Sequence, residues 1–398
     1  MQPVRKKIQE THSDLIKEKP TLTLLVDGNS LLFSSFADPM VNCDGVYVGA
    51  IFQFLLQLRI QLSKREFDKV FVSFDDTYSG VLRYNIYHPY KQNRDKHYEE
   101  YAISDYMKQY NENLRSMQHY IFNKRKKNGE LPLKVEKEKS DWEKFIDENF
   151  DRCRDRLCLY FNEMGIRWHM DEVCEGDDLI AYYCKNKKDN EKVLIMSSDM
   201  DLCQLLSDDV IIYNQIKKIY ISNKNFKQHF GYHPDNILLK KVLLGDVSDN
   251  IGNIRGLSES KLLEIIPEIV DKKVTLDEVK ERTKLLNEER VRNKKKTLQV
   301  YDNILSGTSN KQYDGDFYEI NTLLVDLKNP IITDEMKEEM DGQLDSPLDM
   351  EDRSFKNLVV LINEDKIPDL ISDTKFSSFF SPFNRIYKKE EEYYVKCK

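Results

Sequence analysis

Three short apolar runs stand out in the first half of the chain, at residues 22–26, 70–74 and 193–196. Apolar runs of this length are typical of strands buried in a sheet. Longer apolar patterns with a repeat of three and four residues lie between them, at 51–62 and 142–164, and predict helices. Strands that alternate with helices form βαβ units, so we expect an α/β fold with a mostly parallel central sheet.

The remaining segments have weaker patterns. Residues 84–140 are rich in Tyr, Lys, Arg and Asn without a strand signal, and we expect a long polar excursion from the sheet. Residues 210–221 have a β pattern, and 275–306 have the pattern of a charged helix or helix pair. We expect the acidic segment 315–398, whose pattern is mixed, to be mainly helical.

Composition argues against several classes of protein. The chain has 398 residues, 33% of them charged, and a mean hydropathy of −0.63. It contains no apolar run of the roughly 20 residues that a membrane-spanning helix needs, and the polar first 20 residues lack the apolar core of a secretory signal. The seven cysteines form no CxxC pair, which argues against a disulfide framework or a cysteine zinc site. We therefore expect a soluble cytoplasmic protein that does not bind membranes.

The net charge of −8 is concentrated at one end of the chain. Residues 315–398 contain 19 acidic and 11 basic residues, so the rest of the chain is formally neutral. A neutral body can hold an acidic metal pocket and a basic nucleic-acid surface on different faces. The overall acidity therefore does not exclude a nucleic-acid partner.

Acidic residues gather where the apolar runs end and in two further clusters. Ligands bind beyond the carboxyl ends of parallel strands, so carboxylates there are expected to meet at one edge of the sheet. So many carboxylates repel one another unless cations neutralise them, and oxygen ligands favour Mg²⁺ or Mn²⁺. This number of ligands makes two ions plausible, the arrangement that supports phosphodiester cleavage. The residues are Asp27, Asp75, Glu175, Asp177, Asp178, Asp199, Asp201, Asp246 and Asp249.

Each acidic motif also has an ordinary explanation. Asp27 followed by Gly is most often a turn, residues 246–249 alone are most often a loop, and carboxylates in the first turn of a helix, as expected at 175–178, favour the helix dipole. Asp199 and Asp201 flank one residue at a strand end, where alternate side chains share a direction. The five motifs together, in one chain and in this order, favour a metal site.

With these motifs the sequence resembles the 5′-nuclease superfamily: flap endonucleases, the exonuclease domain of bacterial DNA polymerase I, and phage ribonuclease H-type 5′ to 3′ exonucleases. The resemblance runs from about residue 22 to residue 270 in the family's order. The E-x-D-D, S-x-D-x-D and G-D-x-S-D-N-I motifs have counterparts here. The matching segments are Leu25-Val26-Asp27-Gly28-Asn29, Asp44-Gly45, Gly49-Ala50-Ile51-Phe52, Phe74-Asp75-Asp76, Glu175-Gly176-Asp177-Asp178, Ser198-Asp199-Met200-Asp201 and Gly245-Asp246-Val247-Ser248-Asp249-Asn250-Ile251.

The resemblance implies a PIN-like catalytic domain with a helical arch, followed by a helix-three-turn-helix element that binds DNA. It implies that the nine carboxylates ligate two Mg²⁺ ions, for which Mn²⁺ is expected to substitute. The carboxylates expected to be catalytic are Asp27, Asp75, Asp177 and Asp199.

Residues 90–94 resemble the family's Y-K-x-N-R motif at the base of the arch. There Lys91 and Arg94 would contact the scissile phosphate and stabilise developing charge, and Tyr90 would stack on a base. Arg83 is a further expected phosphate contact. The alternative is a solvated basic stretch with a packing tyrosine. Similarly, the basic run 124–127 would line a passage for a single-stranded 5′ end or serve as a solubilising loop.

The predicted helix-three-turn-helix element departs from its family pattern. Where the family has D-N-I-P-G-V-x-G-I-G, residues 249–258 read D-N-I-G-N-I-R-G-L-S. Asn tolerates left-handed backbone and Ser can cap the next helix, so the turn is still expected to approach DNA. A K⁺ ion at this hairpin is a further expectation. The expected DNA-binding residues are Asn253, Arg255, Gly256 and Ser258.

We therefore predict a polar tail (1–20), a catalytic domain (21–222), a DNA-binding region (223–314) and an acidic extension of unknown role (315–398). The predicted activity is that of a 5′ to 3′ exonuclease or flap endonuclease on branched, nicked or 5′-flapped DNA and RNA–DNA duplexes, as in primer removal. A phage-encoded enzyme is plausible, with a sliding clamp or single-strand-binding protein as further partners. The alternatives are a catalytically silent branched-DNA scaffold, and a PIN-type ribonuclease, which would lack the helix-three-turn-helix signal.

Overall fold

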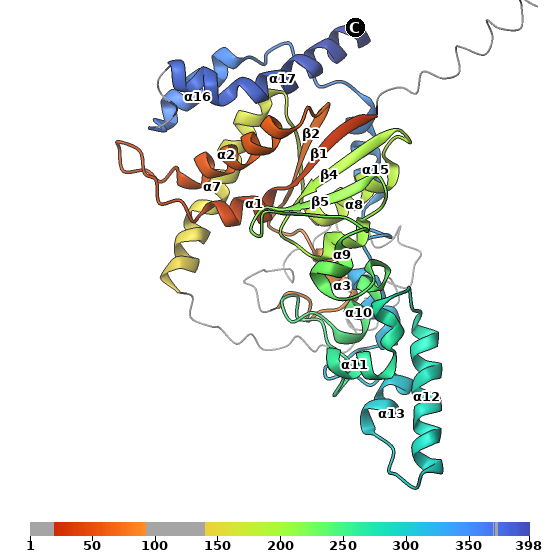
Figure 1. Ribbon diagram of the computed structural model, residues 1–398. Coiled ribbons are helices and arrows are strands. Elements are labelled where there is room, and N and C mark those ends of the chain that lie inside the picture. The colour runs from red at the N-terminus through yellow and green to blue at the C-terminus, as the bar shows by residue number, and fades with distance from the viewer. Residues whose placement is uncertain (1–19, 93–139, 369, 371–372) are drawn as a thin grey trace, which may run out of the picture.

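A six-stranded sheet forms the centre of the molecule in the computed structural model, which describes residues 20–92, 140–368, 370 and 373–398 (Figure 1). The strand order is β3-β2-β1-β4-β5-β6, and all neighbouring strands are parallel except β5 and β6. The predicted α/β fold and its three buried strands, β1, β2 and β4, are confirmed. The strands are β1 (Thr21–Asp27), β2 (Lys69–Asp75), β3 (Arg167–Asp171), β4 (Glu191–Met196), β5 (Val210–Asn214) and β6 (Ile219–Ile221).

The strand order reverses between β1 and β4. The chain runs from β1 outward to β2 and β3, then returns to place β4 on the other side of β1. Such a reversal opens a crevice beyond the carboxyl ends of the two central strands. Asp27 ends β1, and residues 197–201 follow β4, so both acidic segments start at this crevice.

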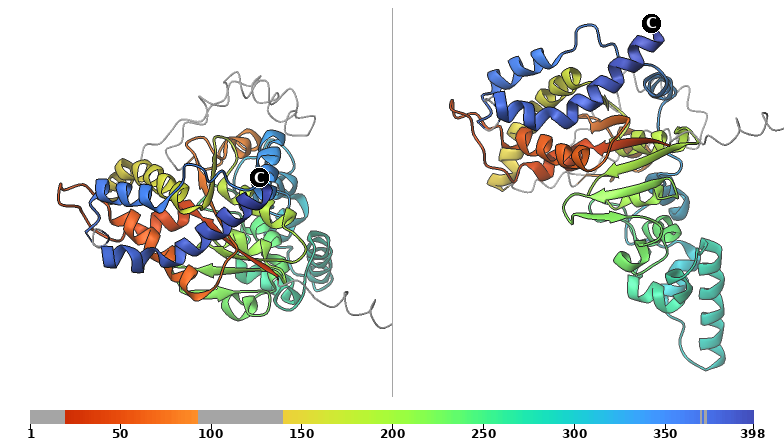
Figure 2. Two further views of the ribbon diagram at one scale, coloured as in Figure 1. Left: turned by 90° about the horizontal axis from the view of Figure 1, so that it is seen from above. Right: turned by 45° about the horizontal axis from the view of Figure 1, so that its top comes forward.

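Helices cover both faces of the sheet (Figure 2). Alternate side chains of β1 enter different cores: Leu24 and Val26 pack with α1, α2 and α7, while Leu25 packs with α8. The predicted helices at 51–62 and 142–164 are confirmed as α2 and α7. The bounds are α1 (Gly28–Ser35), α2 (Gly49–Lys64), α3 (Val81–Ile86), α7 (Asp141–Met164), α8 (Gly176–Asn186) and α9 (Phe226–Phe230).

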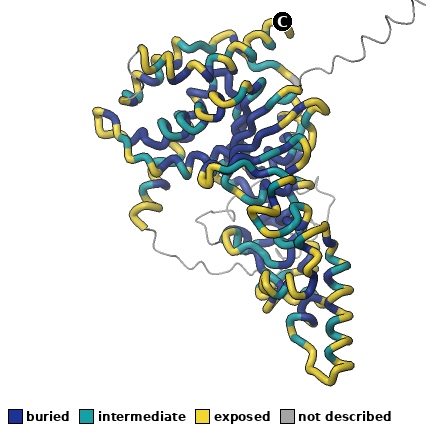
Figure 3. The backbone as a smooth tube through the Cα atoms, in the orientation of Figure 1, coloured by how far each residue is buried: buried dark blue, intermediate teal, exposed yellow. Residues whose placement is uncertain are grey.

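A third core lies beside the sheet and holds together the helices that follow it. Most of its buried residues come from the segment between α10 and α14, and Ile86, Tyr87 and Tyr90 join them. The predicted helix pair at 275–306 is confirmed as α12 and α13, which project away from the sheet with largely exposed outer faces (Figures 1 and 3). The bounds are α10 (Ile237–Leu244), α11 (Glu259–Ile265), α12 (Leu276–Arg292), α13 (Gln299–Ser306) and α14 (Phe317–Val325).

The acidic segment from residue 315 is helical, as expected, and contributes to all three cores. α14 joins the third core, α15 (Asp334–Asp345) packs near α8, and α16 (Phe355–Asp365) and α17 (Asp373–Cys397) return to the α2 and α7 face. A buried ion pair between Arg167 of β3 and Glu390 of α17 joins it to the sheet at 2.7 Å. Beneath its charged surface, this segment has apolar side chains that complete the three cores. Within the described ranges, no helix is long and apolar enough to cross a bilayer.

Candidate active site

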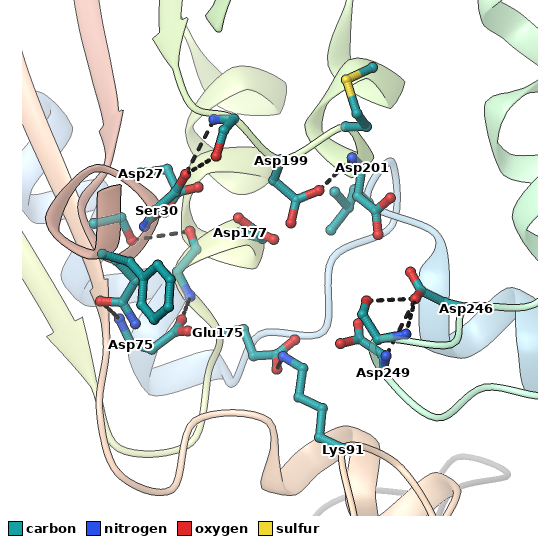
Figure 4. Close-up of a pocket in the computed structure, with 18 of the residues that line it drawn as sticks. Asp27, Ser30, Asp75, Lys91, Glu175, Asp177, Asp199, Asp201, Asp246 and Asp249 are labelled. Carbon is teal, nitrogen blue, oxygen red and sulfur yellow. Dashed lines mark hydrogen bonds and ion pairs between the residues drawn. The ribbon is translucent and has the colours of Figure 1, made fainter. Parts of the chain in front are cut away.

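An acidic pocket of about 860 Å³ opens at the carboxyl edge of the sheet (Figure 4). It extends from the ends of β1, β2 and β4 to the turn between α10 and α11. Eight of the nine predicted carboxylates line it, together with three cations, Arg83, Lys91 and Lys241. The eight are Asp27, Asp75, Glu175, Asp177, Asp199, Asp201, Asp246 and Asp249.

Asp27 is fixed by the turn that joins β1 to α1. Its carboxylate caps α1 by accepting a hydrogen bond from the Ser30 amide (2.9 Å), and it accepts another from the Ser197 hydroxyl at 2.5 Å. The turn needs glycine at position 28, because a Cβ there would lie 2.5 Å from the Phe74 ring. Asp27 therefore caps α1, as in an ordinary turn, and it also lines the pocket.

Asp75 joins the end of β2 to the start of α8. Its Oδ1 accepts a hydrogen bond from the Gly176 amide at 2.7 Å, and its own amide donates to Asn29 Oδ1 at 3.3 Å. These bonds bring Asp177, in the first turn of α8, over the ends of β1 and β2. In Figure 4 its carboxylate faces the space between Asp27 and Asp199.

Asp199 and Asp201 both line the pocket, but the predicted reason, alternation at a strand end, is wrong. β4 ends at Met196, and Asp201 begins a 3₁₀ helix (Asp201–Leu205). The two side chains enter the pocket because the Asp201 amide donates to Asp199 Oδ1 at 2.7 Å, while the Asp199 amide donates to Ser197 Oγ at 2.9 Å.

We call Asp27, Asp75, Asp177 and Asp199 the sheet-side cluster. The pKa of Asp27 is raised to about 7, mainly by burial and also by the charges of Asp199 and Asp75, against the lowering effect of hydrogen bonds from Ser197 and Ser30. Burial also raises the pKa of Asp177 well above its usual value, and the charges of Asp199, Asp27 and Asp75 add to that effect. The negative charge of this cluster is thus poorly compensated by the protein.

We call Asp201, Asp246 and Asp249 the turn-side cluster, and here a lysine supplies the compensation. Lys241 Nζ forms ion pairs with Asp201 (2.6 Å) and Asp246. Burial alone would raise the pKa of Asp246, but Lys241 and hydrogen bonds from Ser248 lower it to about 2. Burial and Asp199 still hold the pKa of Asp201 at about 6.

The sequence interpretation missed Lys241. The signal was a lysine pair within the otherwise apolar helix α10, directly before the Gly245-Asp246 motif.

Glu175 is held in a buried set of ion pairs at the side of the pocket. It accepts from Lys91 Nζ, from Arg83 Nη1 at 2.9 Å and from the Tyr90 hydroxyl at 3.0 Å. Although Glu175 precedes α8, it makes no side-chain capping bond there. The ordinary capping explanation therefore does not account for Glu175.

The structure does not bring Asp178 into the pocket. Its side chain is 0% exposed, forms a two-pronged ion pair with Arg83, and accepts a bond from the Ile331 amide at 3.0 Å. Arg83 is only 3% exposed, and its Nε donates to the Leu324 carbonyl at 2.8 Å. The ion pair has a structural role, and Asp178 does not line the pocket where it was expected to ligate metal. Arg83 does line the pocket, so its phosphate contact stays a prediction.

Tyr90 is likewise unsuited to base stacking in this arrangement. It is 2% exposed, and burial next to Glu175 raises its pKa well above the usual value, which keeps its hydroxyl a hydrogen-bond donor. Lys91 has left-handed backbone (φ 50°), and its amide donates to the Asp249 carbonyl at 2.9 Å. Arg94 and the run 124–127 lie outside the described residues.

The residues expected to bind DNA in the turn before α11 are partly exposed. Arg255, Gly256 and Ser258 lie on the surface, and Gly256 has a positive φ of 79°. Ser258 caps α11 as expected, accepting from the Lys261 amide at 3.2 Å. Asn253 is half-buried, and its carbonyl accepts from Ser309 Oγ at 2.9 Å. The asparagine with left-handed backbone in this turn is Asn250 (φ 60°) and not Asn253.

Two exposed aromatic side chains at the same pocket were not among the predicted site residues. Phe33 of α1 is 58% exposed and Trp142 of α7 is 50% exposed, and both line the pocket. The helical pattern had placed Trp142 on the apolar face of α7. Trp142 differs from the buried residues of that pattern in its position, because it lies in the first turn of α7, which extends past the sheet.

The chemistry of the pocket fits a hard divalent cation, because its donors are carboxylate oxygens with little compensating charge on the sheet side. Within the described residues, no three acidic, histidine or cysteine side chains are already gathered closely enough to hold an ion directly. Binding would therefore use water ligands or small side-chain movements, and Mg²⁺ commonly retains several waters in proteins.

Residues 22–127 and 144–231 match a protein family described as the 5'-3' exonuclease, N-terminal resolvase-like domain. The chain is 28% identical over 240 residues to a 5'-3' exonuclease of Mycoplasmopsis pulmonis (strain UAB CTIP), a match that covers 59% of this chain and 63% of that protein. It is 26% identical over 287 residues to DNA polymerase I of Bacillus subtilis (strain 168), covering 67% of this chain and 27% of the polymerase. The matches thus span less than two thirds of these relatives.

Two solved structures have a similar fold. The T5 D15 protein, co-crystallised with metal ions, aligns with a TM-score of 0.52 at 16% identity over 92% of this chain and 99% of its own. The T5 5'-exonuclease with bound zinc aligns with a TM-score of 0.52 at 17% identity, with the same coverage. At these identities the similarity establishes a common fold.

Proposed function

Because the chain belongs to the 5′-nuclease superfamily, we propose that it is a divalent-metal-dependent, structure-specific 5′-nuclease. The observation that carries this proposal is the acidic pocket, in which, among the described residues, eight carboxylates from five segments of the chain lie with three cations. The substrate would be branched, nicked or 5′-flapped DNA, or an RNA–DNA duplex. The predicted division into a catalytic domain (21–222) and a DNA-binding region (223–314) is part of the proposal.

The carboxylates would hold Mg²⁺ in two groups. Asp27, Asp75, Asp177 and Asp199 have the greater unbalanced charge and would form the main site, with Asp201, Asp246 and Asp249 as the second. When bound, the metal would supply positive charge against the phosphate and favour deprotonation of a water. A K⁺ ion at the 249–258 turn stays a prediction.

Phosphodiester hydrolysis requires a water oxygen to bond to phosphorus while the bond from phosphorus to the 3′ oxygen breaks. The proton lost by the water balances the one gained by that oxygen, which leaves a 5′-phosphate and a 3′-hydroxyl. Lys91 would stabilise the negative charge that develops on the phosphate. Its ammonium is paired with Glu175, so it would exchange this carboxylate for the phosphate. Arg94 is proposed to assist from outside the described residues.

The test is cleavage of a 5′-labelled flap duplex and of a nicked RNA–DNA duplex, with Mg²⁺ and with EDTA. Short labelled products that require Mg²⁺ are the expected result, and their sizes separate flap cutting from exonuclease action. Tight DNA binding without cleavage in Mg²⁺ or Mn²⁺ would instead favour a branched-DNA scaffold. Sliding-clamp or single-strand-binding partners remain predictions to be tested by co-purification.

A further inference from the structure

We propose that Trp142 is a stacking platform for an unpaired nucleobase next to the acidic pocket. The inference rests on the proposed function, because the base would belong to the single-stranded 5′ end of the substrate. It assigns a nucleobase contact to a residue outside the matched motifs, after the structure has shown that Tyr90 is buried and bonded to Glu175.

The first support is where the chain exposes aromatic surface. Among the Phe and Trp residues that the structure describes, only Phe33 and Trp142 are exposed, and both line the same acidic pocket. Large aromatic side chains are usually buried, since each removes 150–250 Å² from water when covered. Aromatic surface kept in water at a proposed nucleic-acid site is well suited to stack on bases, because every base has a π-face.

The second support is that the Trp142 ring is held rigidly. It lies in the first turn of α7, where Ser140 and Glu143 form a capping box, and the Ser140 amide donates to Glu143 Oε2 at 2.8 Å. The indole stacks on Phe145, with ring centroids 5.8 Å apart and an interplanar angle of 23°. A fixed ring binds a base with little loss of side-chain entropy.

A chain of aromatic rings connects this platform to the core. Phe145 packs edge-on against Tyr47 at 4.9 Å, and Tyr47 stacks on buried Phe36 at 5.6 Å. The Tyr47 hydroxyl donates to the Asp38 carbonyl at 2.8 Å, which fixes the inner end. One face of the indole is thus covered by protein, and half of the side chain remains exposed beside the pocket.

The test uses the small number of tryptophans. The chain has two, and Trp168 lies in β3 with its indole N–H donated to Asn162 at 3.0 Å. In Trp168→Phe, emission therefore reports on Trp142 alone. The full-length variant is titrated in EDTA with a duplex carrying an oligothymidine 5′ flap, while anisotropy of a dye on the DNA measures binding separately. We expect the Trp142 emission to be quenched in step with binding, and to be unchanged with abasic flap nucleotides.

Affinity gives a second readout. Trp142→Ala should weaken binding of the flapped duplex roughly tenfold, within the range for loss of one base stack, and leave the flapless duplex unchanged. Trp142→Tyr should recover most of the affinity. The control for the fluorescence titration is Trp142→Phe. In this variant only Trp168 emits, so DNA binding should cause no quenching.

The outcomes are separable. Saturated binding with unchanged Trp142 emission, or an unchanged affinity of Trp142→Ala for the flapped duplex, would overturn the stacking role and leave the nuclease proposal intact. No binding of either duplex would overturn both proposals. Melting of Trp142→Ala should match that of the unaltered protein, because the side chain is half exposed.

Discussion

The sheet-side and turn-side clusters line one pocket, but the protein balances their charges differently. On the sheet side, burial and mutual repulsion raise the pKa of Asp27 and Asp177. On the turn side, Lys241 pairs with Asp201 and Asp246, and the pKa of Asp246 falls to about 2. Identical side chains in one cavity therefore differ in how strongly they need an external cation.

The largest expected effect comes from neutralising one carboxylate in each cluster. Asp177→Asn and Asp201→Asn should each lower Mg²⁺-dependent cleavage by about 10³-fold or more while leaving DNA affinity within about tenfold. The melting temperatures of the metal-free proteins should move in opposite directions for Asp177→Asn and Asp246→Asn. Asp177→Asn removes a buried carboxyl group that its neighbours repel and should raise the melting temperature. Asp246→Asn takes a partner from Lys241, which lowers the pKa of Asp246, and should lower the melting temperature.

The matched control for this pair is Asp76→Asn, which alters a carboxylate beside Asp75 that does not line the pocket. Its cleavage rate should be close to that of the unaltered protein. Retained cleavage in Asp201→Asn would contradict the assignment of the S-x-D-x-D segment, and melting shifts of one sign would contradict the difference between the clusters.

Arg83→Met should have the next largest effect. The change leaves Asp178 and Glu175 without their buried guanidinium partner, and loss of one member of a buried ion pair costs about 3–5 kcal/mol. Denaturant unfolding in EDTA measures the loss. Arg154→Met, whose ion pairs are with exposed Asp151 and Asp155, is the control and should cost much less. Near-normal stability of Arg83→Met would argue against a structural role.

Lys241→Met should have a smaller effect that makes the clusters more alike. Without the ammonium, the metal-free protein should lose roughly 1–2 kcal/mol, because the ion pairs are only partly buried. Added Mg²⁺ should then stabilise the variant more than the unaltered protein, since metal would replace the missing cation. Lys240→Met, on the same helix but paired with exposed Glu259, should show neither effect.

The last expected effect is a pH dependence of the metal-free protein. The pKa of Asp27 rises from 3.8 to about 7 on folding, so between these values the folded protein holds a proton that the unfolded chain has lost. The melting temperature in EDTA should therefore fall as pH rises from about 4 to about 7. Mg²⁺ should oppose this fall, because it binds the deprotonated carboxylates. Asp27→Asn should flatten the profile, and an unchanged slope would mean that other groups dominate.

Most of the central elements and the candidate chemistry could be predicted from the sequence alone. The apolar runs predicted β1, β2 and β4, and the repeats of three and four residues predicted α2 and α7, because those patterns report burial along a single element. β3 was missed, since Arg167-Trp168-His169-Met170-Asp171 is a short polar edge strand. The motifs also predicted which carboxylates to examine, and eight of the nine line one pocket.

Which charged side chains contact one another depends on the packing of distant segments. Asp177 and Asp178 are neighbours in sequence, yet the first faces the pocket and the second is paired with Arg83, because successive residues of a helix point in different directions. Lys241 joins Asp201 through the packing of α10 near the 3₁₀ helix that begins at Asp201, a contact across 40 positions that no local pattern contains. Trp142 fits the apolar repeat of α7, but it lies at the end of the helix that extends past the sheet. Its exposure therefore depends on where the packing of α7 against the sheet ends.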